Sequence, residues 1–193
     1  MATTVDSSVE TYTIIAEPLT PEAFAPFGTV LTRTDQERLP INLYDGKVDV
    51  YRPAAIDTAQ PLEWLLTRNH VRDFKVTYLE RHFGVAQAFV ALEQPFISCV
   101  AAPDCDLVDG VPAFDQVHAF IVPAGQACQI HKGTWHEPPF ALVDKSYTLI
   151  TSHQALTAGL GLALDKKGEI GDLDVDKRNI QERTGKVLRI AFA

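Results

Sequence analysis

From about Phe74 onward, residues of two faces alternate with a period of two, which is the pattern of a half-buried β-strand. One face would carry Phe74, Val76, Tyr78 and Glu80, and the other Lys75, Thr77, Leu79 and Arg81. Further runs rich in residues that favour β-strands cover residues 87–92, 96–101, 116–122, 126–130 and 146–152. Clusters of Gly and Pro separate the runs, notably at 123–125. Several short strands at this spacing predict an all-β barrel or sandwich.

The flanking segments predict a few short helices. Residues 12–17 can pair as a strand, and Thr20 before Pro21 is a helix N-cap signal, with the helix ending near Gly28. A second short helix is expected over 61–67, carrying Trp64 and Leu65 inward. The remaining expectations are loops over 153–185 with a short helix near 175–183, and a closing strand over 187–192.

No segment has the composition of an interdomain linker, so residues 1–193 are expected to form one domain. Residues 1–11 form a polar stretch that we expect to be a flexible tail. The first ten residues lack the basic and apolar regions of a signal peptide, and no apolar run reaches the ~20 residues of a membrane helix. These features predict a cytoplasmic protein.

Charge and cysteine content narrow the function classes. The net charge of −8 argues against nucleic-acid and anionic-membrane partners, which need a basic surface. An anionic small molecule stays compatible with this charge if cations cluster locally. Three cysteines at irregular spacing give neither a disulfide framework nor a CxxC metal motif.

Two segments concentrate residues that carry chemistry. In the first, Glu80 and His82 are two apart and share one face of a strand, and Gln87 follows a turn at Gly84. In the second, Gly133 permits a tight turn between His131 and His136. Imidazole, carboxylate and amide groups together predict either a metal site or general acid–base chemistry.

Each residue also has a structural interpretation. Glu80 can be a strand carboxylate paired with Arg81 or Lys75, and His82 can be a buried structural histidine. Gln87 can simply bind a neighbouring backbone group, and Lys132 on a loop is usually solvated. The joint spacing of the two segments favours a site, with His136 as its strongest member.

The two segments resemble the two cupin motifs. The first cupin motif is HxH, three or four residues, then Glu; here it reads Glu80-x-His82, four residues, then Gln87. The second motif begins at Gly125 and ends at His136, with His131 in the place of the usual Pro. The resemblance implies a mainly β, single cupin-like antiparallel barrel of the jelly-roll type. It also implies Glu80, His82, Gln87 and His136 as ligands of a divalent metal, held weakly or not at all because Gln is a neutral ligand.

A narrower resemblance involves the Glu80-Arg81-His82 and Gln87-Ala88-Phe89 segments together with the HKGTWH segment at 131–136. These are similar to the ureidoglycolate lyase family, as is the opening at 18–28. The resemblance implies a lyase of allantoin and purine degradation that releases glyoxylate and urea, with a homodimer as a family-like assembly. It assigns His136, His131 and Lys132 to catalysis.

The same resemblance assigns the small anionic substrate to Asn42 and Arg81, with Arg81 or Lys132 holding its carboxylate. The chain departs from the family after Asn42, at Glu137 and around Ser152, which leaves the exact substrate open. Two alternatives stay open. One is another cupin enzyme, an isomerase or amidohydrolase acting on a related ureido or amide acid. The other is a cupin that binds a small molecule without catalysis.

Overall fold

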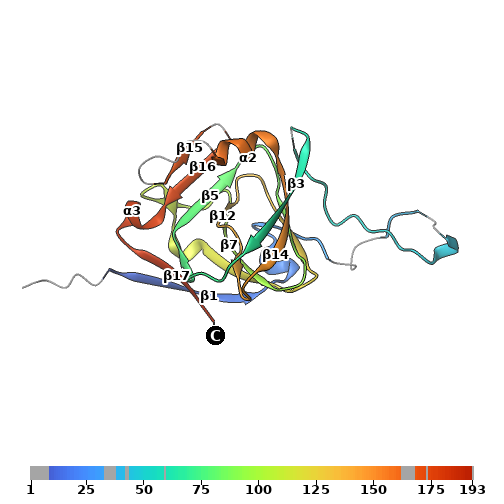
Figure 1. Ribbon diagram of the computed structural model, residues 1–193, viewed down its shortest axis with the longest axis horizontal. Coiled ribbons are helices and arrows are strands. Elements are labelled where there is room, and N and C mark those ends of the chain that lie inside the picture. The colour runs from blue at the N-terminus through green and yellow to red at the C-terminus, as the bar shows by residue number, and fades with distance from the viewer. Residues whose placement is uncertain are drawn as a thin grey trace, which may run out of the picture.

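The computed structural model describes residues 9–32, 38–41, 44–58, 60–161, 168–172 and 174–192, and its elements are mainly β-strands (Figure 1). The strands are β1 (Thr11–Pro18), β2 (Gly28–Val30), β3 (Leu62–Asn69), β4 (Lys75–Val76), β5 (Tyr78–His82), β6 (Ala88–Ala91), β7 (Phe96–Ala101), β8 (Leu107–Val108), β9 (Val111–Pro112), β10 (Val117–Val122), β11 (Ala127–Ile130), β12 (Trp135–His136), β13 (Phe140–Ala141), β14 (Ser146–His153), β15 (Ile170–Gly171), β16 (Val175–Asn179) and β17 (Val187–Ala191). The helices are α1 (Pro21–Phe24), α2 (Gln154–Gly161) and α3 (Ile180–Thr184), with 3-10 turns η1 (Tyr44–Gly46) and η2 (Phe114–Gln116).

The strands form a curled ten-stranded sheet, a five-stranded sheet and the hairpin β8–β9. The larger sheet has the order β15-β16-β5-β12-β7-β10-β1-β17-β4, with β13 pairing with β7, and the smaller one has the order β2-β11-β6-β14-β3. The expected mainly β class with short helices is confirmed. The expectation of one closed antiparallel barrel is not met, because the strands lie in separate sheets and β1 pairs in parallel with both β10 and β17.

Strand β7 divides the interior into two cores. All six of its residues are buried, so its alternating side chains face apolar surroundings on both sides. Phe96 and Val100 belong to the core shared with the five-stranded sheet, whereas Ile97, Cys99 and Ala101 belong to the core on the other side. We call the face of the ten-stranded sheet that carries Val100 its inward face, because it looks toward the five-stranded sheet.

The N-terminal signals correctly predicted the first elements. The Thr20 hydroxyl accepts a hydrogen bond from the backbone N–H of Ala23, and Pro21 opens α1. The strands on either side, β1 and β2, join different sheets, so this region is an integral part of the fold. Residues 1–8 of the expected tail lie outside the described residues, and Thr11 already belongs to β1.

The helix expected over 61–67 is wrong, because this segment lies within strand β3 and pairs with β14 over eight residues. Leu65 does pack against the core shared by the sheets, but Trp64 is 62% exposed. Adjacent apolar residues in this segment obscured the period of two. Exposed and half-buried residues alternate along β3, so Trp64 lies on its exposed face, which only the folded structure reveals.

The C-terminal expectation is corrected as well. The helix expected near 175–183 is two elements: strand β16, which pairs with β5, and helix α3, whose N-cap is Asn179. Helix α2 replaces part of the loop expected over 153–185, and the closing strand β17 was expected. Of the helices in the described ranges, none combines the length and apolar composition that crossing a membrane requires.

Candidate functional site

The pairing of β5 with β12 assembles the central group of the site. His136 of β12 lies directly opposite Glu80 of β5 on one side and Val100 of β7 on the other. Directly paired residues project from the same face of a sheet, so Glu80 and His136 share the inward face with Val100. His82, two residues after Glu80, projects from that face too.

Glu80, His82 and His136 form a compact buried group. The Oε1 atom of Glu80 lies 3.7 Å from Nε2 of His82 and 3.9 Å from Nε2 of His136. The two imidazole rings meet edge to face, with their centroids 4.9 Å apart. All three residues are at most 7% exposed, so their charges and ring nitrogens face little bulk water.

The neighbouring backbone orients the His136 ring. Its Nδ1 atom lies 3.0 Å from the carbonyl oxygen of Thr134, which can only accept a hydrogen bond. Nδ1 therefore carries the proton, and Nε2 presents a lone pair toward Glu80. Phe89 of β6 closes the apolar side of the ring, with centroids 5.9 Å apart.

Burial and local charge set the protonation states of this group. Burial lowers the pKa of His136 to about 4, so its imidazole is neutral near pH 7. Burial also acts to raise the pKa of Glu80, but the polar contact with His82 and the charges of His136, His82 and Lys177 outweigh it and lower that pKa to about 2. Because His136 is neutral near pH 7, the polar contact with His82 and the positive charge of Lys177 are the contributions that keep the pKa of Glu80 low there.

The donor set of this group fits a divalent metal ion. One ligand atom from each of the three residues lies within 4.8 Å of the others. The Nδ1 atom of His82 is buried and has no hydrogen-bond partner among the described residues, which is unusual for a structural histidine. A carboxylate with two neutral imidazoles is a ligand combination that suits borderline divalent metals.

Gln87 immediately precedes β6 of the facing sheet. Its carbonyl oxygen accepts the N–H of Ile130, and its side chain is only 5% exposed. Ile130 belongs to the core between the two sheets, and Gln87 lies opposite it, so both side chains face that core. Within the described chain, no hydrogen bond joins the Gln87 side chain to Glu80, His82 or His136.

His131 and Lys132 lie outside the buried group of Glu80, His82 and His136. Gly133 adopts a positive φ of 79° and its N–H binds the carbonyl oxygen of His82, so the expected turn is present. The turn buries His136 but leaves His131 exposed at a pocket of about 330 Å³, beside Lys132. The ammonium of Lys132 lies 2.7 Å from the carboxylate of Asp57. A larger pocket of about 400 Å³, lined by residues of β1, β8, β9 and η2, contains none of the expected site residues.

Arg81 projects from the face opposite Glu80. Its guanidinium donates to Asp176 at 3.0 and 3.2 Å and lies 4.3 Å from the ring centroid of Trp135. Alternation along β5 accounts for this separation, since Arg81 lies between Glu80 and His82. Asn42 lies outside the described residues.

Sequence reasoning did not identify Lys177. This residue lies on β16 directly opposite Glu80, and its Nζ atom is 3.7 Å from Oε2 of Glu80. No motif surrounds it, and the segment was expected to be helical. The signal that reveals Lys177 is the strand register, which the sequence does not contain.

Comparisons with known proteins agree on one family. The family model described as "Ureidoglycolate lyase" matches residues 11–161. The protein named ureidoglycolate lyase from Pseudomonas fluorescens Pf-5 is 34% identical over 150 residues, covering 70% of this chain and 86% of that protein. The protein of the same name from Burkholderia mallei NCTC 10229 is 38% identical over 144 residues, covering 69% of this chain and 78% of that protein. That of Pseudomonas syringae pv. syringae B728a is 35% identical over 147 residues, covering 69% and 83%.

Proposed function

The chain belongs to the ureidoglycolate lyase family, and on this premise we propose that it splits ureidoglycolate into glyoxylate and urea, a step of allantoin and purine degradation. The single observation that carries the proposal is the family match over residues 11–161, which contains Glu80, His82, Gln87 and His136. The buried group formed by Glu80, His82 and His136 is the proposed reaction centre.

The reaction needs one proton to move. Ureidoglycolate is a hemiaminal, whose central carbon carries a hydroxyl, a urea nitrogen and a carboxylate. As the C–N bond breaks, the hydroxyl loses its proton, its oxygen becomes the carbonyl oxygen of glyoxylate, and the departing nitrogen gains a proton. One base that takes the hydroxyl proton and returns it to the nitrogen balances the reaction.

His136 is the residue we assign to this transfer. Its Nε2 lone pair is available because Thr134 holds the proton on Nδ1, and its neutral state near pH 7 follows from burial. Thr134 fixes the ring direction without entering the reaction. Phe89 and the surrounding core exclude water from one side of the ring.

A divalent metal is part of the proposal. In the metal-bound form Glu80, His82 and His136 would hold the ion, with His136 using the same Nε2 atom, so His136 is the base only in the metal-free form. Gln87 faces the same interior from the other sheet. When bound, such an ion acts as a Lewis acid that lowers the pKa of a hydroxyl group. The carboxylate and imidazole ligands favour a borderline divalent metal.

Turnover and its products test the function. Purified protein with added divalent metals should release intact urea and glyoxylate from ureidoglycolate. Release of ammonia and carbon dioxide instead would assign a hydrolase. Acceleration of neither reaction would contradict the proposed function and favour another cupin substrate or a binding protein.

The cupin jelly-roll architecture, a single domain over 1–193 and a cytoplasmic location stay predictions that agree with this enzyme class. A small-molecule substrate follows from the family, and the net charge of −8 argues against nucleic-acid and anionic-membrane partners. His131 and Lys132 keep a proposed role at the exposed pocket rather than in the buried group.

We also propose a homodimer, supported by an apolar stripe on β3. Leu62, Trp64 and Leu66 project from one face of this edge strand and are 40%, 62% and 61% exposed. Sedimentation velocity should give twice the mass of the chain, and Trp64→Glu should shift the protein toward monomer because it places a charge in the apolar stripe. A wild type that is monomeric at micromolar concentration would contradict the proposal.

A further inference from the structure

We infer that Lys177 is the cation that binds the carboxylate of the substrate, an inference that rests on the proposed function. The first argument is position. Strand register places Lys177, Glu80 and His136 in one row across β16, β5 and β12, all on the inward face. Lys177 therefore borders the buried group, although it lies beyond residues 11–161, where the family match is found.

The second argument is the state of the ammonium group. Glu80 turns Oε1 toward both histidines and Oε2 toward Lys177, whose Nζ atom lies 3.7 Å away. This separation is longer than a hydrogen bond, so the ammonium keeps donors for another anion. The face of Tyr78 supports it, with Nζ 4.8 Å from the ring centroid. The side chain is only 20% exposed, so solvent screens its charge incompletely.

The third argument is that the other cations near this region are engaged elsewhere. Arg81 faces the opposite side and is bound to Asp176. Arg72 donates to Glu137 and to the carbonyl oxygen of Pro138. The ammonium of Lys132 is paired with Asp57 at the exposed pocket. Among the described residues, Lys177 is the cation whose ion pair joins it to the Glu80–His82–His136 group.

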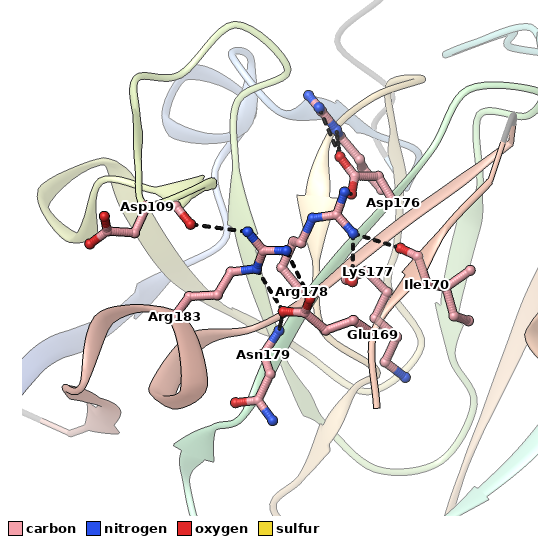
Figure 2. A network of polar contacts seen from close by, with 9 residues as sticks. Asp109, Glu169, Ile170, Asp176, Lys177, Arg178, Asn179 and Arg183 are labelled. Carbon is pink, nitrogen blue, oxygen red and sulfur yellow. Dashed lines mark hydrogen bonds and ion pairs between the residues drawn. The ribbon is translucent and has the colours of Figure 1, made fainter. Parts of the chain in front are cut away.

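The fourth argument is that β16 is held in register. Figure 2 shows the polar network of this segment, in which Arg178 binds Asp176 and the carbonyl oxygens of Ile170 and Lys177. Arg183 forms a two-pronged contact with Glu169, which also accepts the N–H of Asn179 (Figure 2). In that view no hydrogen bond or ion pair joins the ammonium of Lys177 to the other residues drawn. The network therefore fixes the backbone while the Lys177 side chain stays available on the other face.

A substrate comparison separates carboxylate binding from other roles. N-(hydroxymethyl)urea has the same hemiaminal carbon as ureidoglycolate but no carboxylate. In the wild type, kcat/KM for ureidoglycolate should exceed that for N-(hydroxymethyl)urea. In Lys177→Met the ratio of the two kcat/KM values, ureidoglycolate over N-(hydroxymethyl)urea, should fall about 10- to 100-fold, which is the range of one charge-assisted hydrogen bond. Lys177→Arg should recover most of it, because the positive charge remains.

The controls exclude a merely structural effect. Lys75→Met removes a lysine from the same sheet whose ammonium binds Gln181, and it should leave the ratio unchanged. A Lys177→Met variant that loses activity equally on both substrates would overturn the inference. So would a variant that keeps the wild-type ratio, or a Lys132→Met variant in which the ratio falls instead.

The same variants separate this inference from the proposed function. If the wild type turns over neither compound, the proposed function fails, and calorimetric titration with glyoxylate decides the role of Lys177. Binding that is lost in Lys177→Met and kept in Lys177→Arg and Lys75→Met would support a carboxylate site. Equal glyoxylate binding by Lys177→Met and the wild type, or its absence from the wild type, would overturn it.

Discussion

His136→Ala should lower kcat about 10²- to 10⁴-fold while leaving the circular dichroism spectrum unchanged, because the residue supplies the proposed proton transfer. Its Nε2 atom is the ring nitrogen directed at Glu80, and the carbonyl oxygen of Thr134 occupies the other one. Truncation removes a ring from the space between Phe89 and His82, so some loss of thermal stability is expected alongside the kinetic effect.

His131→Ala and Lys132→Ala provide the comparison within the same segment. Both residues lie at the exposed pocket, so their substitution should be milder, with Lys132→Ala mainly raising KM. Steady-state kinetics on all three variants measures the difference. Equal and mild effects from His136→Ala and Lys132→Ala would mean that the chemistry does not take place at His136.

Glu80→Gln should weaken divalent metal binding about 100-fold or more. Glu80 is the carboxylate of the three-residue group, and a neutral amide of the same shape is a poor ligand beside two imidazoles. Changes in outer-shell residues alone cost roughly 10–100-fold in metal affinity, so loss of a ligand should exceed that range. Calorimetric titration with metal, and thermal unfolding with and without metal, measure the effect.

Glu137→Gln is the matched control for this prediction. Glu137 is as buried as Glu80, at 7% exposed, but it binds Arg72 and the backbone N–H of Tyr78 instead of the histidines. Its substitution should leave metal affinity unchanged. A wild type that binds no divalent metal, or a Glu80→Gln variant that binds as tightly as the wild type, would contradict the metal proposal.

Local sequence signals predicted the structure correctly where all the residues involved lie in a single helix or strand. Thr20 and Pro21 predicted the start of α1, and the spacing of Glu80 and His82 placed both on one strand face. The same alternation places Arg81 on the other face, so the sequence already contained that result. The signals failed at residues 61–67 and 175–183, where adjacent apolar or charged residues hide the period of a strand.

The sequence by itself determined the mainly β class, the cupin-like spacing and three of the residues that meet: Glu80, His82 and His136. Only the tertiary structure decided that Lys177 joins them and that His131 and Lys132 lie at a different pocket. The physical reason is that side-chain direction follows local backbone geometry, whereas cross-strand neighbours follow sheet register. The register of β5 and β16, segments far apart in the chain, is set by how the buried faces of both strands pack in the whole fold, so no local signal in either segment specifies the pairing of Lys177 with Glu80.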